Sequence, residues 1–261
     1  MERLSGRVAI VTGSSSGNGR AIALRLAAEG ARVLCCDIVP DPRPGGFDDE
    51  PTYATHDLII SRKGEAAFQP CDVGEESAVA EAFLAATRKW GAVNAVVLNA
   101  GIFHRDVSIA DESSQEHDSI MRVNERGVWL GLREAGRTFI RQGGSGRVVC
   151  IASIAGLVGL ALEPSYCASK GAVVALVREA ALDLARHRIN VNAICPGFIA
   201  TAMLQQELAD PEYRGQLESL TPWPRLGTAN DVAGATAFLL SDDAEWITGS
   251  ILAVDGGYTC R

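Results

Sequence analysis

The chain has 261 residues, of which 47% are hydrophobic and 21% charged, which is ordinary usage for a globular protein and excludes a mainly disordered chain. Its 24 Lys and Arg residues against 32 Asp and Glu residues give a formal net charge of −8 without a basic cluster, so we expect no nucleic acid partner. No apolar run reaches the length of a membrane span and the first residues lack the pattern of a secretory signal peptide, so we expect no membrane partner either.

Short apolar runs alternate along the chain with longer stretches rich in Ala and Leu. The runs are apolar throughout, which predicts strands buried on both faces of a parallel sheet. The predicted strands are Val8–Val11, Arg32–Cys36, Ala67–Pro70, Val93–Leu98, Arg147–Ala152, Ile189–Ile194 and Ile251–Val254. The predicted helices are Gly19–Glu29, Glu75–Trp90, Gln115–Arg141, Ser165–Arg186 and Asp231–Leu240. This alternation predicts an α/β fold, a Rossmann-type doubly wound parallel sheet of about seven strands with helices on both faces.

Two segments interrupt this alternation. Residues 40–66 are rich in Pro, Gly and acidic residues, and we interpret them as an irregular surface insertion with a short helix near Thr55–Ile60. Residues 200–226 contain three prolines beside apolar residues, which is typical of a lid over a binding site. No internal repeat is visible, so residues 1–261 are expected to form a single domain.

The seven cysteines are odd in number and show no CxxC spacing, and most lie in apolar runs. This usage favours reduced thiols in a cytoplasmic protein over a disulfide framework. The same spacing argues against zinc, so we predict no metal site.

The first predicted strand leads directly into a glycine-rich turn, Thr12-Gly-Ser-Ser-Ser-Gly-Asn-Gly19, and then into a helix. Glycines let the backbone approach a pyrophosphate closely, and the helix N-terminus offers free N–H groups. Asp37 ends the second strand, where a carboxylate can accept hydrogen bonds from an adenosine ribose. Taken alone, Asp37 is better explained as an ordinary turn residue.

Tyr166 and Lys170 are four residues apart, which places both side chains on one face of a helix. A tyrosine of ordinary pKa is a poor acid–base catalyst at neutral pH, and a cation one turn away would lower that pKa. Ser153 follows the fifth predicted strand, at the end where doubly wound sheets bind their ligands. Each residue taken singly also fits an ordinary structural role.

Together these features resemble the short-chain dehydrogenase/reductase family in its compact form, over nearly the whole chain. The matching motifs are Thr12 to Gly19 for TGxxxGxG, Asn99-Ala-Gly101 for NAG, Asn124 in the fourth helix, Ser153, Tyr166-Cys-Ala-Ser-Lys170 for YxASK, Pro196-Gly197 with Thr201, and the Ile247 to Gly257 terminal segment. The resemblance implies a catalytic tetrad of Asn124, Ser153, Tyr166 and Lys170. Tyr166 would exchange the proton, Ser153 would polarise the substrate oxygen, Lys170 would bind the nicotinamide ribose, and Asn124 would hold a relay water.

The resemblance also implies the cofactor-binding residues. These are Gly13, Ser15, Ser16, Gly17, Asn18, Gly19, Asp37, Asp72, Val73, Asn99, Ala100, Gly101, Tyr166, Lys170, Pro196, Gly197, Ile199 and Thr201. Asn18 stands where the family usually has isoleucine, and the 40–66 segment is longer than the usual second crossover. We interpret that segment as a surface insertion, with a contact to a neighbouring subunit as the alternative.

The resemblance predicts an NAD-dependent oxidoreductase that transfers a hydride between a nicotinamide and a secondary alcohol or ketone. The alternatives are a 3-oxoacyl-thioester reductase and a non-catalytic cofactor-binding regulator on the same fold. An enoyl reductase is a further possibility, although that branch usually spaces its tyrosine and lysine more widely. The family also implies a homotetramer.

NAD is favoured over NADP because Asp37 would repel a 2′-phosphate, with Arg43 as the one nearby base that could oppose this. The candidate substrate pocket is mostly apolar and indicates, in falling order, a secondary alcohol, a cyclic or aromatic ketone, a steroid or a sugar-derived polyol. Its residues are Phe103, Ile154 to Leu162, Phe198, Met203 and Trp223, with His104 and Glu163 near the mouth.

Overall fold

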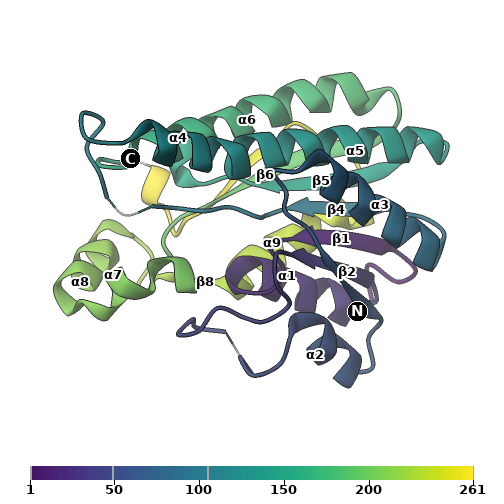
Figure 1. The fold of residues 1–261 in the computed structure, drawn as a ribbon, viewed down its shortest axis with the longest axis horizontal. Coiled ribbons are helices and arrows are strands. Elements are labelled where there is room, and N and C mark those ends of the chain that lie inside the picture. The colour runs from purple at the N-terminus through teal and green to yellow at the C-terminus, as the bar shows by residue number, and fades with distance from the viewer. Residues whose placement is uncertain (1, 49, 105, 261) are drawn as a thin grey trace.

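The computed structural model describes residues 2–48, 50–104 and 106–260. Within these ranges, seven parallel strands form one sheet in the order β3-β2-β1-β4-β5-β6-β9 (Figure 1). The strands are β1 (Val8–Thr12), β2 (Arg32–Asp37), β3 (Ala66–Pro70), β4 (Ala95–Leu98), β5 (Gly146–Ile151), β6 (Ile189–Pro196) and β9 (Ile251–Val254), and β7 (Ile199–Ala200) pairs with β8 (Gly227–Thr228) apart from them. The predicted doubly wound α/β fold is therefore confirmed.

Helices cover both faces of this sheet (Figure 1). The helices are α1 (Gly17–Ala28), α2 (Thr55–Ser61), α3 (Glu76–Trp90), α4 (Ser114–Met121), α5 (Gly127–Arg141), α6 (Pro164–Ala185), α7 (Gln205–Ala209), α8 (Pro211–Leu220) and α9 (Ala229–Leu240). One apolar core joins α3, α5 and α6 to the sheet, and a second joins α1 and α9 to its other face. Because both faces are buried, the strands carry apolar residues continuously rather than alternately. No helix in the described part of the chain is long and apolar enough to span a membrane.

The predicted helix Gln115–Arg141 is wrong as a single element. In the structure, α4 ends at Met121, a π-helical turn spans Arg122–Arg126, and α5 begins at Gly127. A single π turn of five residues changes the spacing over too short a stretch for the apolar pattern to reveal it. A capping box begins α9, with the side chains of Thr228 and Asp231 bonded to each other's backbone N–H.

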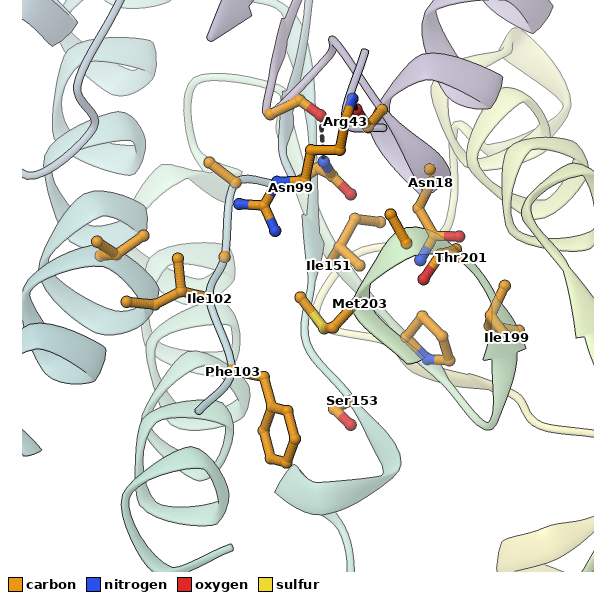
Figure 2. Close-up of a pocket in the computed structure, with 18 of the residues that line it drawn as sticks. Asn18, Arg43, Asn99, Ile102, Phe103, Ile151, Ser153, Ile199, Thr201 and Met203 are labelled. Carbon is orange, nitrogen blue, oxygen red and sulfur yellow. Dashed lines mark hydrogen bonds between the residues drawn. The ribbon is translucent and has the colours of Figure 1, made fainter. Parts of the chain in front are cut away.

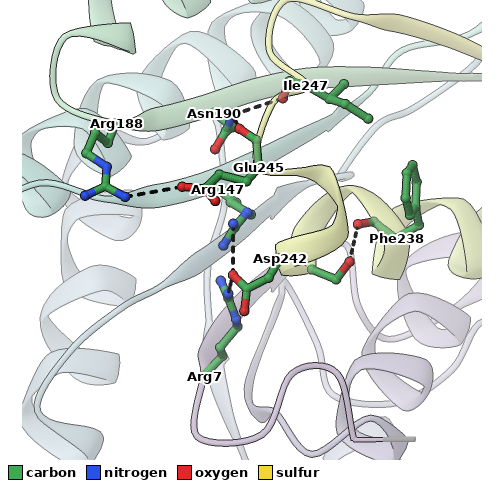
Figure 3. Close-up of polar contacts among 9 residues, drawn as sticks. Arg7, Arg147, Arg188, Asn190, Phe238, Asp242, Glu245 and Ile247 are labelled. Carbon is green, nitrogen blue, oxygen red and sulfur yellow. Dashed lines mark hydrogen bonds and ion pairs between the residues drawn. The ribbon is translucent and has the colours of Figure 1, made fainter.

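The amino ends of the central strands are closed by an ionic cluster (Figure 3). Asp242, which follows α9, pairs with Arg7 before β1 at 2.5 Å and with Arg147 of β5 at 3.0 Å. Asn190 of β6 donates to the carbonyl oxygen of Ile247 at 3.0 Å. These contacts hold α9 and the segment before β9 at the amino ends of the strands. The cavity lies at the opposite, carboxyl ends.

The irregular insertion lies against α1, and its short helix near Thr55–Ile60 is present as α2. A buried arginine of α1 anchors it: Arg20 donates to the carbonyl oxygens of Glu50 and Tyr53 at 2.9 and 2.8 Å and to Thr55 Oγ1 at 3.1 Å. Thr55 in turn donates to the carbonyl oxygen of Ser14 at 2.7 Å. Asp49, which belongs to the predicted insertion, lies outside the described residues.

Candidate active site

The site forms where the strand order reverses direction, between β1 and β4, which is the usual ligand position in doubly wound sheets. Thr12 at the end of β1 accepts hydrogen bonds on its hydroxyl from the N–H groups of Asn99 and Ala100, at 2.9 and 3.1 Å. The Asn99 side chain donates back to the carbonyl oxygens of Thr12 and Gly13 at 2.9 and 3.2 Å (Figure 2). These bonds fix the Asn99-Ala-Gly101 turn against the glycine-rich loop.

A cavity of about 450 Å³ runs along this edge of the sheet. The predicted catalytic and cofactor-binding residues that line it are Gly13, Ser15, Ser16, Gly17, Asn18, Asp37, Asp72, Val73, Asn99, Ala100, Gly101, Ser153, Tyr166, Lys170, Pro196, Gly197, Ile199 and Thr201. The other two predicted residues, Gly19 and Asn124, are buried behind the wall. Residues at or just beyond the carboxyl ends of β1, β2, β3, β4, β5 and β6 therefore meet around one elongated space.

The glycine-rich loop needs its glycines for close packing. Gly13 has φ +65°, and a Cβ there would lie 2.8 Å from the Ala100 Cα. A Cβ on Gly19 would lie 1.9 Å from the Gly13 carbonyl oxygen, so only glycine lets α1 start this close to β1. Asn18, at the second position of α1, lines the cavity with a buried side-chain oxygen that has no hydrogen-bond partner among the described residues. A buried acceptor without a partner indicates a place for a ligand donor.

Asp37 lies at the end of β2, as the sequence predicts, and its carboxylate is fixed by backbone donors. It accepts from the N–H of Ser15 at 3.0 Å and from the N–H of Ile38 at 2.8 Å. The carboxylate thus stands between the glycine-rich loop and the rim of the cavity. Asp72, just beyond β3, is paired with Arg122 at 2.6 Å, which closes the same end of the cavity.

Tyr166 lies in the first turn of α6, and Ser153 follows β5. Burial raises the pKa of Tyr166 to about 12, and a hydrogen bond with Ser153 acts in the opposite direction. The Phe103 ring packs edge-on against the Tyr166 ring, with centroids 5.3 Å apart. The tyrosine and the serine are therefore in contact at an apolar end of the cavity, where a carbonyl oxygen could meet both hydroxyls.

Lys170 lies one turn along α6 from Tyr166, with its Nζ 5.6 Å from the centre of the tyrosine ring. Its ammonium group donates to the Ile151 carbonyl oxygen at 2.9 Å, and burial lowers its pKa to about 8. The sequence-based expectation that Lys170 brings the tyrosine pKa down is wrong for this arrangement. Burial raises the pKa of Tyr166 more than any group nearby lowers it, and the lysine is directed to the backbone of β5.

Asn124 sits in the π-helical turn and is fully buried. Its side-chain oxygen accepts from the Ile102 N–H at 2.8 Å, and its amide nitrogen donates to the Ile102 carbonyl oxygen at 2.9 Å and to Ser169 Oγ at 3.2 Å. A Cβ added to Gly101 would lie 3.3 Å from the Asn124 oxygen and 3.5 Å from Lys170 Nζ, so both groups flank Gly101. The asparagine thus holds the loop after β4 beside the lysine.

The apolar end of the cavity contains fewer than half of the predicted substrate residues, and within the predicted range Ile154 to Leu162 only Ile154 and Leu160 line it. Those that line it are Phe103, Ile154, Leu160, Phe198 and Met203. Glu163 also lines it, and its pKa is raised to about 7 by burial first and then by Asp106 and Glu207. His104 is not part of the lining.

The prediction for Trp223 is wrong. This side chain lines a separate hollow with Phe47 and Leu226. The Trp223 N–H donates to the Gly256 carbonyl oxygen at 2.9 Å, which holds this part of the 200–226 segment against the end of the chain rather than over the cavity.

Several lining residues escaped the sequence analysis. They are Ile38, Val39, Asp41, Cys71, Ile102, Arg122, Val123, Ile151, Ala152, Ala202 and Leu204. Most of them immediately follow a strand or a motif residue, and that position at a carboxyl end was the signal available in the sequence. Arg43, considered only as a possible exception to the NAD prediction, lines the cavity as well.

The chain is similar to a family model and to named proteins over nearly its whole length. A family model described as enoyl-(acyl carrier protein) reductase matches residues 13–259. The 2-(R)-hydroxypropyl-CoM dehydrogenase of Xanthobacter autotrophicus is 39% identical over 255 residues, which cover 97% of this chain and 98% of that protein.

Among solved structures, a short-chain type dehydrogenase/reductase from Mycobacterium marinum matches with a TM-score of 0.90 at 32% identity, covering 99% of this chain and 97% of that one. A putative 2-deoxy-D-gluconate 3-dehydrogenase from Agrobacterium tumefaciens with bound NADP matches with a TM-score of 0.88 at 34% identity, covering 99% and 98%.

Proposed function

The chain belongs to the short-chain dehydrogenase/reductase family, and from this premise we propose that it is an NAD-dependent oxidoreductase acting on a secondary alcohol or ketone. Similarity to named dehydrogenases supports an enzyme that acts on a CH–OH group. The observation that carries the proposal is the meeting of Ser153, Tyr166 and Lys170 at one end of the cavity whose other end is the glycine-rich loop. One cavity thus joins an acid–base group to a dinucleotide-binding loop.

The residues present fit a nicotinamide dinucleotide. The glycine-rich loop and the N-terminus of α1 line the cavity, and the Asn18 oxygen lacks a partner among the described residues. When bound, the cofactor would supply the hydride acceptor or donor. Residues Asn99 to Gly101 and Pro196 to Thr201 would hold its nicotinamide end, and Asp37 its adenosine end.

The chain's own residues would then manage the substrate oxygen and the proton. Ser153 would donate a hydrogen bond to that oxygen and fix its position beside Tyr166. Tyr166 would give its hydroxyl proton to the carbonyl oxygen in reduction, and in oxidation its phenolate form would take the proton of the alcohol. Lys170 would hold the nicotinamide ribose, and Asn124 would keep the Ile102 loop in place so that a water could connect Lys170 to solvent.

Asp37 supports the choice of NAD over NADP. Its fixed carboxylate would accept hydrogen bonds from the ribose hydroxyls of NAD and would repel a 2′-phosphate. A solved relative with bound NADP makes the cofactor the first point to test. A carboxylate next to the 2′-phosphate, with no cation to oppose it, weakens NADP binding on the order of 2–4 kcal/mol, which is tens- to hundreds-fold in kcat/KM.

The experiment measures turnover of NADH and NADPH with a panel of cyclic, aromatic and aliphatic ketones. We expect activity with at least one ketone and a kcat/KM for NADH at least tens-fold higher than for NADPH. Asp37→Ser combined with Ile38→Arg should move the preference toward NADPH. Equal kcat/KM for both cofactors in the unchanged enzyme would contradict the role of Asp37, and cofactor binding without turnover of any ketone would favour a regulator.

We also propose that residues 1–261 act as one domain, in a cytoplasmic homotetramer without a metal ion. The cysteine usage supports the compartment, and family membership supports the assembly. The apolar lining, which consists of Phe103, Ile154, Leu160, Phe198 and Met203, supports a small, largely apolar substrate.

A further inference from the structure

Residues of the insertion contact the glycine-rich loop at the N-terminus of α1. The Arg43 N–H donates to Ser16 Oγ at 2.6 Å, and Ser15 Oγ donates to the Val39 carbonyl oxygen at 2.7 Å. The Asp48 carboxylate accepts from the Gly17 N–H at 2.9 Å. Residues 38–48 are therefore seated on the loop that would receive the cofactor, and they are not a remote surface excursion.

Because residues 38–48 lie on the glycine-rich loop, the Arg43 side chain reaches the cavity. Figure 2 shows the Arg43 side chain extending from the insertion in the direction of Asn99, and both residues line the cavity. Within residues 2–48, 50–104 and 106–260, no carboxylate pairs with this guanidinium. The other cations of the lining are engaged: Arg122 pairs with Asp72 and Glu75, and Lys170 donates to the β5 backbone.

The strand order indicates which part of the cofactor lies near Arg43. Asp37, at the end of β2, marks the adenosine ribose, and Asn99 ends β4, on the other side of β1. A dinucleotide crosses from the β2 side to the β4 side with its diphosphate at the start of α1. A guanidinium that extends from the β2 side toward Asn99 therefore points along the path that the diphosphate would take.

We propose that Arg43 is a diphosphate-binding residue, supplied by the insertion to a loop that has no base of its own. The loop offers Ser14, Ser15, Ser16 and Asn18, while Asp37 and Asp41 add negative charge to the same cavity. A planar guanidinium can bind two phosphate oxygens at once and offset this charge. The inference rests on the proposed function, because it takes the cavity to hold a nicotinamide dinucleotide.

The test is equilibrium binding by calorimetry, with NADH, NADPH, ADP and adenosine as probes. Arg43→Ala should weaken NADH, NADPH and ADP by a similar factor of about 10- to 100-fold, because each carries the diphosphate, and should leave adenosine unchanged. Arg43→Lys keeps the charge but loses the two-pronged geometry, so it should lie between the two. Arg88→Ala, which removes an exposed arginine of α3 outside the cavity, is the matched control and should bind all four probes as the unchanged protein does.

A loss confined to NADPH would overturn the proposal, because it would make Arg43 a reader of the 2′-phosphate. Unchanged binding of all four probes by Arg43→Ala would overturn it too, while leaving the proposed function intact. Failure of the unchanged protein to bind either NADH or NADPH would overturn the proposed function together with this inference.

Discussion

The tyrosine and the lysine of the site are both buried, and burial acts on their pKa values in opposite directions. It raises the pKa of Tyr166 to about 12 and lowers the pKa of Lys170 to about 8. Each shift favours the neutral form, because a charge loses the solvation of water on burial. At neutral pH the tyrosine therefore holds its proton, which suits a proton donor to a carbonyl. The lysine keeps its positive charge below about pH 8, where it can hold a ribose hydroxyl.

Tyr166→Phe separates proton transfer from cofactor binding. The change removes one hydroxyl and leaves the ring packed on Phe103, so the shape of the cavity is kept. We expect kcat for ketone reduction to fall by at least about 10²–10⁴-fold, with NADH binding retained. Tyr53→Phe, which removes an exposed hydroxyl of the insertion, is the control and should be fully active. Turnover near that of the unchanged enzyme would show that Tyr166 is not the proton donor.

At the scale of elements, the pattern of apolar runs predicts the strands well because both faces of the sheet are buried. β2, β3 and β9 agree with their predicted ranges to within one residue. The glycine-rich turn and the Tyr166–Lys170 spacing likewise locate most of the site, since they depend on neighbours in sequence. Contacts between distant segments were not predictable: the π turn is fixed by bonds from Asn124 to Ile102, and the course of the insertion by bonds to Arg20.

Arg20 shows why the insertion could not be placed from sequence. An arginine in an amphipathic helix is ordinarily expected at the surface, yet this one is 1% exposed and its pKa is lowered by burial. Its guanidinium group satisfies carbonyl oxygens of an irregular segment that has no ladder or helix to bond them. The anchoring of residues 50–55 on α1 is therefore a tertiary effect without a local pattern.

Arg20→Ala tests this anchoring. The change leaves the carbonyl oxygens of Glu50 and Tyr53 without that donor and opens a cavity, so we expect the free energy of unfolding to fall by about 2–4 kcal/mol in urea titrations. Arg62→Ala, which removes an exposed arginine paired with Glu50 at 2.6 Å, should change it by no more than about 1 kcal/mol. Equal losses for the two variants would show that the buried anchor contributes no more than a surface ion pair.

At the scale of the whole molecule, the outer surfaces of α5 and α6 expose large apolar side chains after the sheet is covered. Leu182 of α6 is 81% exposed and Trp129 of α5 is 41% exposed, with the Arg133 guanidinium 4.8 Å from the Trp129 ring centre. The two helices run side by side on the same face of the sheet (Figure 1). Large apolar side chains this exposed on neighbouring helices indicate a surface that another subunit covers.

The proposed homotetramer therefore depends on the α5–α6 surface. Light scattering at micromolar concentration should give a mass near four times the 27.6 kDa of one chain. Leu182→Glu places a charge on this surface, and since burying an unpaired charge is unfavourable, the mass should fall to that of a dimer or a monomer. Leu84→Glu makes the same change at a half-exposed position on α3 and should leave the assembly intact. A mass of one chain for the unchanged protein would contradict the tetramer, and a Leu182→Glu tetramer would move the interface away from α5 and α6.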